Sequence, residues 1–276
     1  MEMPRHKIAF AAISFILGML ILYFLGSALQ DALGMVGLML TEFLILGIAL
    51  ISTLASRLSL KEVFCIKRSL SKEWLASFFI YLSAFFGAAA VSYLLSYLSP
   101  SLAQRSTQLN SFMMSGGFAL ALLCVALLPA ICEEAWHRGY LLTSLGSIKG
   151  VASRVVIMGL LFGIFHLDQT RFFQTMILGM ALSFMRIKTN NFLIPVVFHG
   201  INNLLSLSMM FALSQLTQAL GPEASGAAMD ASQAALPLTL LIPLVCFTLA
   251  FSLGFLLLGR HQFKRAAVLR ESLCGK

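Results

Sequence analysis

Three short strings hold side chains that could activate a water molecule. They read Glu-Glu-Ala-Trp-His-Arg at 133–138, Phe-Gly-Ile-Phe-His at 162–166 and His-Gly-Ile-Asn-Asn at 199–203. Each lies inside or beside a long apolar run, where an ionisable side chain is costly and commonly has a function. A carboxylate screened from water can act as a general base, histidine can share or return a proton, and His and Asn can donate to an oxyanion. These residue types therefore indicate hydrolysis.

Helical spacing places the groups within each string. Glu134 and Arg138 are four residues apart, so they share a helix face and can pair. Glu133 points about 100° away and is left for other partners. His199 and Asn203, also four apart, face the same way.

The helices that carry Glu133 and His166 are expected to form a hairpin that turns at Lys149-Gly150. The two residues are 17 and 16 positions from Gly150, so antiparallel packing puts them level and in one site. Level placement requires either that the hairpin projects beyond the inner face or that the 167–171 turn is sunk into the bilayer.

Each residue also has a structural interpretation. An isolated intramembrane histidine often bonds neighbouring helices, and a Glu-Arg pair at a helix end often serves as an anchor. Glu42, the one carboxylate of the second apolar run, is expected to pair with a neighbouring helix, and His137 to lie at the interface. Cys132 is expected to pack as a small apolar residue. Two glutamates, two histidines and an asparagine on three segments are hard to explain as independent anchors.

Metal-dependent and metal-free chemistry both stay open at this point. No HExxH string occurs, and the five cysteines form no CxxC pair. Glu133, His166 and His199 are nevertheless a chemically adequate zinc ligand set. No cofactor is expected, with zinc as the alternative.

Composition identifies the elements that must position these groups. The chain has 276 residues, of which 59% are hydrophobic and 11% charged, against about 25% charged in soluble domains. We predict an all-α, polytopic membrane bundle of about eight transmembrane helices. The expected apolar segments are Ile8–Ala28, Leu33–Ala55, Trp74–Leu98, Phe118–Cys132, Val155–Leu167, Phe172–Met185, Phe192–Met210 and Leu236–Leu258.

The distribution of basic residues predicts the orientation. With the N-terminus inside and eight spans, 17 of the 19 Lys and Arg residues face inward, and Arg105 and Arg171 remain outside. Both termini are therefore expected in the cytoplasm. The net charge of +8 follows these loops, without the basic-aromatic pattern of a nucleic-acid binder. Membrane lipids are expected partners, and nucleic acid is not.

The three strings in this order resemble the signature of the CPBP family, which comprises CAAX proteases and bacteriocin-processing enzymes and is also called the Abi family. That signature is Glu-Glu-x-x-x-Arg, then Phe-x-x-x-His, then His-x-x-x-Asn or Asp. The resemblance covers about 129–205. His137 departs from the pattern, because the family more often has an aromatic residue before the arginine.

This resemblance implies a CAAX-protease-like intramembrane endopeptidase. Glu133 would activate water together with His166, His199 and Asn203 would stabilise the oxyanion, and Glu134 and Arg138 would support the site. Relatives are described both as metalloproteases and as metal-free glutamate proteases; the asparagine of the third string favours the latter here. The substrate would be a membrane-associated peptide or protein, prenylated or bacteriocin-like, and the location a bacterial inner membrane.

We expect one transmembrane domain over 1–276. Its parts would be scaffold spans at 1–115, a catalytic core at 116–213, and an outer loop, last span and basic cytoplasmic tail at 214–276. Outer loops are expected at Ser99–Gly117 and Gln215–Ala235. Two competing functions remain: a non-catalytic immunity or peptide-binding membrane protein, and an ion-coupled transporter that uses Glu42, against which the lack of internal repeats counts.

Overall fold

The structure, a computed structural model, describes residues 6–99, 111–233 and 237–274. Every regular element in this part of the chain is helical, which confirms the all-α prediction. The elements are α1 (His6–Ile21), η1 (Leu22–Gly26), α2 (Ser27–Leu33), α3 (Met35–Ala55), α4 (Leu60–Val63), α5 (Ser71–Leu98), α7 (Gly117–Ala121), η2 (Leu122–Leu127), α8 (Leu128–Glu134), η3 (Ala135–Leu141), α9 (Leu142–Ser144), η4 (Leu145–Ser147), α10 (Val151–Phe165), α11 (Phe172–Thr189), α12 (Leu193–Gln233) and α13 (Leu238–Cys274).

Within the described residues, six helical stretches are long and apolar enough to cross a membrane. They are Lys7–Leu33, Met35–Ala55, Ser71–Leu98, Gly117–Ser147, Leu193–Ala219 and Leu238–Ser272, with mean hydropathy between 1.5 and 2.6. Many large apolar side chains on these helices point outward; Phe24 and Ile51, for example, are each 68% exposed. A water-soluble monomer rarely exposes so much contiguous apolar surface. The chain therefore has the features of an integral membrane protein.

The remaining two expected spans are helical but shorter. α10 has 15 residues and α11 has 18, against the roughly 20 that a span requires. Small residues let these two helices pack closely. A methyl group at Gly163 would lie 2.9 Å from the carbonyl oxygen of Phe172, and one at Gly159 would lie 2.8 Å from that of Met176. The Gly159-x-x-x-Gly163 spacing is typical of tight helix pairs in membranes.

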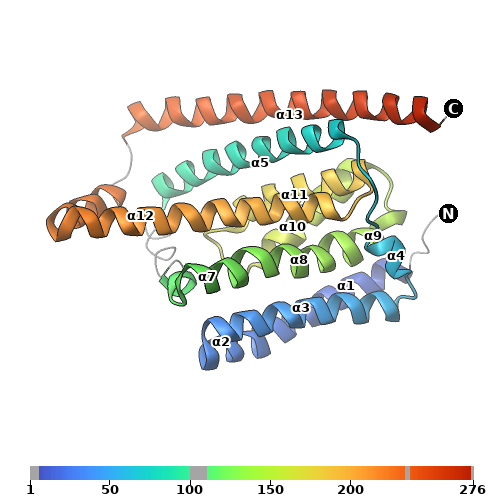
Figure 1. The fold of residues 1–276 in the computed structure, drawn as a ribbon, viewed down its shortest axis with the longest axis horizontal. Coiled ribbons are helices and arrows are strands. Elements are labelled where there is room, and N and C mark those ends of the chain that lie inside the picture. Colours follow the sequence, from blue (N-terminus) through green and yellow to red (C-terminus); the bar gives the residue numbers. More distant parts are fainter. Residues whose placement is uncertain (1–5, 100–110, 234–236, 275–276) are drawn as a thin grey trace.

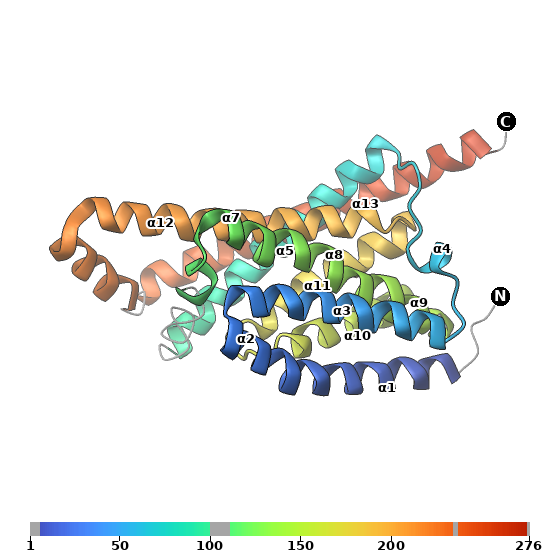
Figure 2. The same ribbon diagram turned by 60° about the horizontal axis from the view of Figure 1, so that its bottom comes forward.

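The helices lie side by side around two main apolar cores (Figures 1 and 2). One core joins α1 and α3 to the α8–η3 stretch and includes Trp136, Tyr140 and Cys132, which confirms the packing role expected for that cysteine. The other joins α5, α11 and the start of α12 and includes Phe162. α13 packs along α5 at the edge of the bundle (Figure 1). The α8–η3 stretch thus contributes to the centre of the molecule.

The second expected outer loop, Gln215–Ala235, is largely helical, so the prediction of a loop conformation there is wrong. Residues 215–233, within the expected outer loop Gln215–Ala235, continue α12 as helix to Gln233, and the ribbon turns back on itself there (Figure 2). The segment contains several alanines, and alanine has the strongest helix propensity. The other expected outer loop, Ser99–Gly117, falls largely on 100–110, outside the described residues.

Candidate active site

Glu134 and Arg138 form a buried ion pair at the centre of the site. Arg138 Nη1 donates to Glu134 Oε1 over 2.6 Å, and neither side chain is exposed. The remaining donors of Arg138 reach α11, with Nη2 bonded to the Gly179 carbonyl at 3.0 Å and Nε to Ser183 Oγ at 3.3 Å. The predicted pair is therefore present and fixes η3 against α11.

Phe162 lies beneath the guanidinium and joins the three strings. Its buried ring is 4.2 Å from Arg138 Cζ and 4.9 and 5.6 Å from the rings of His166 and His199. A methyl group at Gly179 would lie 2.8 Å from Phe162 Cβ, so α11 must be small at this point. The first, second and third strings thus converge on one aromatic side chain.

His199 lies between the two glutamates. Its Nδ1 is 2.9 Å from Glu134 Oε1, while its Nε2 is 4.0 Å from Glu133 Oε2. Because Glu134 is already paired with Arg138 as a carboxylate, the Nδ1 proton is the one that its oxygen accepts. The other nitrogen of His199 consequently faces Glu133.

Glu133 differs from Glu134 in its partners. It is 7% exposed, and its Oε2 is buried without a hydrogen-bond partner in the described part of the chain. Buried carboxylate oxygens are normally bonded, and exceptions call for an explanation such as a catalytic role. The expectation that Glu133 stays free while Glu134 pairs is met by this geometry.

His166 ends α10 rather than lying inside a helix. It is half-buried, and its Nδ1 donates to the Phe162 carbonyl over 2.8 Å, which leaves Nε2 as the nitrogen free to act as a base. Leu167 follows at a φ of +50° and turns the chain toward α11. The hairpin turn at the other end is confirmed, because helix stops at Ser147 and restarts at Val151 after Gly150, whose φ is +89°.

Asn203 follows His199 by four residues on α12 and bonds to the backbone. Its Nδ2 donates to the Val125 carbonyl over 3.2 Å. Pro129, four residues after Val125, has no N–H to offer that carbonyl. The asparagine therefore supplies the bond that the proline removes, a role that the sequence pattern did not predict.

Two further ionisable residues lie near the site. His137 is fully buried, with its ring 4.8 Å from that of Phe165. Its helix is wound as a π-helix that packs both faces inward. Glu42 of α3 is buried, and its carboxylate lies close enough to interact electrostatically with that of Glu133.

Gly179 and Ser183 position Arg138 but were not predicted as site residues. The one sequence feature that could have identified them is the spacing of two small residues four positions apart.

The sequence alternative names Glu133, His166 and His199 as zinc ligands. Among the described residues, no three His, Cys, Asp or Glu side chains are grouped so as to hold a metal ion.

Helices of membrane-spanning length thus bury a cluster of carboxylate and histidine side chains. Comparison with known families goes further: residues 115–205 match the model of the family described as Type II CAAX prenyl endopeptidase Rce1-like, so the chain contains a domain of this family. The match includes all six candidate residues and begins at 115 rather than 129. Neither the curated proteins nor the solved structures gave a match. Membership of the domain in this family implies a membrane peptidase.

Proposed function

We propose that this chain is an intramembrane endopeptidase that hydrolyses a peptide bond in a membrane-associated peptide or protein, with Glu133 as general base. The observation that carries the proposal is the contrast within the Glu-Glu pair. Glu134 is held by Arg138 and His199, while Glu133 keeps a buried oxygen unpartnered, 4.0 Å from His199 Nε2. The family match supports the reaction class, and prenylated CAAX-type or bacteriocin-like peptides are the substrate classes proposed.

The proposed reaction uses only side chains of this chain. Glu133 takes a proton from water as the water oxygen attacks the scissile carbonyl carbon. The oxyanion that forms is stabilised by donors from His199, through Nε2 when protonated, and from the second Nδ2 hydrogen of Asn203. The amide nitrogen then accepts a proton from Glu133 or His166, the C–N bond breaks, and a free amine and a carboxylic acid leave.

The proposal is tested by Glu133→Gln and His166→Ala, each assayed for cleavage of a prenylated peptide in reconstituted vesicles. General-base loss is expected to lower kcat by about 10²- to 10⁴-fold. Glu62→Gln changes an exposed glutamate away from the site and is expected to keep full activity. Because no metal is used in the proposed reaction, a chelator is expected to leave the wild-type rate unchanged.

Two results would decide against this function. If both variants insert normally and still cleave, the enzymatic role assigned to these residues is wrong. If the variants lose no cellular protection against a bacteriocin while no cleavage is detected in any of them, the non-catalytic immunity function is the better description.

We further propose eight spans, with α10 and α11 as two short ones, and both termini in the cytoplasm. The support is the common end at which the chain begins and finishes in Figures 1 and 2, together with the basic residues near that end.

A further inference from the structure

A cavity of about 900 Å³ lies outside the candidate active site, between α5, α10, α11 and α13. None of the six candidate catalytic residues lines it. α11 separates the two, because Gly179 and Ser183 bond Arg138 on one side while Met180 and Phe184 line the cavity on the other. The cavity is therefore a distinct feature of the fold.

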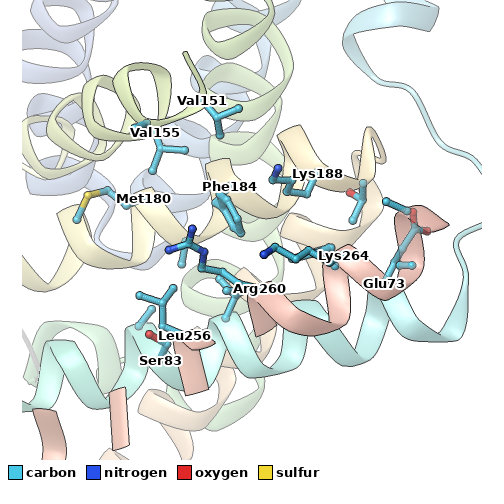
Figure 3. A pocket seen from close by; sticks show the side chains of 18 of the residues that line it. Glu73, Ser83, Val151, Val155, Met180, Phe184, Lys188, Leu256, Arg260 and Lys264 are labelled. Carbon is cyan, nitrogen blue, oxygen red and sulfur yellow. The ribbon is translucent and has the colours of Figure 1, made fainter. Parts of the chain in front are cut away.

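The walls divide into an apolar part and a basic part. Val151, Val155, Met180, Phe184 and Leu256 form apolar wall, and Figure 3 shows Arg260 and Lys264 reaching from α13 toward Phe184 and Lys188 of α11. Lys188 lies in the last turn of α11, and Arg260 and Lys264 lie in the C-terminal half of α13. The arrangement is amphipathic.

Most of the basic charge has no acidic partner. Glu73 is the one carboxylate among the lining residues, and it is bound to Arg270 at 2.8 Å. In the described part of the chain, no ion pair engages the other four lining cations, Lys67, Lys188, Arg260 and Lys264. Burial and then the charge of Arg270 lower the pKa of Lys67, which lies in the loop before α5, while Glu73 acts in the opposite direction.

The position of the cations matches the depth of a lipid headgroup. α13 runs from Leu238 without a charged residue until Arg260. That apolar stretch is roughly 33 Å long at about 1.5 Å per residue, close to the roughly 30 Å of hydrocarbon in a bilayer. Arg260 and Lys264 then lie where phosphate groups of one leaflet begin, and the apolar wall lies at the depth of acyl chains.

We propose that this cavity binds an anionic phospholipid. Its phosphate is bound by Arg260, Lys264 and Lys188, and an acyl chain lies along Val155, Met180 and Leu256. Arginine can bind phosphate oxygens in a bidentate way, and Lys188 Nζ lies 5.6 Å from the centroid of the Phe184 ring, which also lines the cavity. Basic pockets between transmembrane helices are recurrent sites for such headgroups.

The test is native mass spectrometry of the full chain in detergent, with phosphatidylglycerol and phosphatidylcholine of identical acyl chains added in equal amounts. The wild type is expected to retain phosphatidylglycerol at least about tenfold over phosphatidylcholine, since each cation near the headgroup is worth about fivefold. Arg260→Gln/Lys264→Gln is expected to lose this preference. Both side chains are exposed, so the fold is expected to persist, and unfolding temperature verifies that.

Matched controls separate this site from general surface charge. Arg265→Gln removes an exposed cation of the same helix that does not line the cavity, and it is expected to keep the preference within twofold. Ala267→Trp puts bulk at a lining position and is expected to reduce retention, whereas Val268→Trp, next to it and 67% exposed, is not.

Four outcomes would overturn the proposal. Equal retention of both lipids would leave only an apolar groove, and an equal loss in Arg265→Gln would leave only surface charge. Binding of inorganic phosphate as tightly as phosphatidylglycerol would indicate an anion site without a lipid. Displacement of phosphatidylglycerol by a prenylated peptide would assign the cavity to substrate.

Discussion

Arg138 is the residue on which the candidate site depends structurally. Its guanidinium is fully buried and uses its donors on Glu134, Gly179 and Ser183. A buried charge that loses its partner is strongly destabilising, because the remaining charge stays desolvated. The pair with Glu134 could be predicted from the four-residue spacing. The α11 partners could not, since they depend on how two separate helices pack.

Arg138→Met is expected to lower the free energy of unfolding by about 3–5 kcal/mol, because Glu134 is left buried without its cation. The double variant Glu134→Gln/Arg138→Met is expected to be less destabilised than the sum of the two single variants. Denaturant unfolding in detergent micelles measures both. Arg265→Met, on an exposed side chain, serves as the control and is expected to stay within about 0.5 kcal/mol of wild type. Additive losses would contradict the coupling.

At the scale of elements, Pro129 and Asn203 together explain a hydrogen bond that joins α12 to the η2–α8 stretch. The proline leaves the Val125 carbonyl without its helical donor, and the asparagine amide takes that place. The two residues are 74 positions apart in the sequence, so a scan for local spacing identifies each but not their connection.

This connection gives a rescue experiment. Asn203→Ala is expected to cost about 0.5–1.5 kcal/mol of stability, the net value of one hydrogen bond. In a Pro129→Ala background, residue 129 regains an N–H that can bond the Val125 carbonyl, so the same substitution is expected to cost less. Thermal unfolding of the four proteins in one detergent gives the coupling. An equal cost in both backgrounds would refute the exchange of donors.

Element boundaries show what a single sequence can predict. The turn at Lys149-Gly150 was predictable because a glycine lies between two apolar runs, and the φ of +89° at Gly150 agrees with a break in the helix there. The sequence predicted a loop at 215–233, where α12 continues as helix. Small residues and a Gly-Pro pair are typical of loops, but the alanines of this segment favour helix. The π-helical winding of η2 and η3 leaves no pattern in composition or charge.

At the scale of the whole molecule, apolar segments and basic loops predicted an all-helical membrane protein. Arg138 is buried within η3 and paired with Glu134, as the four-residue spacing indicated. The sequence also predicted that the three strings meet. It did not predict that Glu42 lies near Glu133, because that placement depends on how α3 packs against α8.

The proposed orientation can be measured with single cysteines in a background that lacks the native ones. A thiol at Lys61, near the terminal end of the bundle, is expected to be shielded from a membrane-impermeant reagent in intact cells. A thiol at Gln215, toward the opposite end, is expected to react. Both positions are exposed in the structure. The reverse labelling pattern would invert the topology and place the anionic-lipid cavity in the other leaflet.

Because η3 is wound as a π-helix, the number of residues in this segment determines which way its side chains point. An α-helix has 3.6 residues per turn, and a π-helix fits in more. Deleting one residue from 135–141 would let the backbone relax to ordinary winding, but would rotate Tyr140, which meets Ser56 at 3.0 Å, away from its partner. We therefore expect a one-residue deletion to be tolerated less well than most substitutions in this stretch.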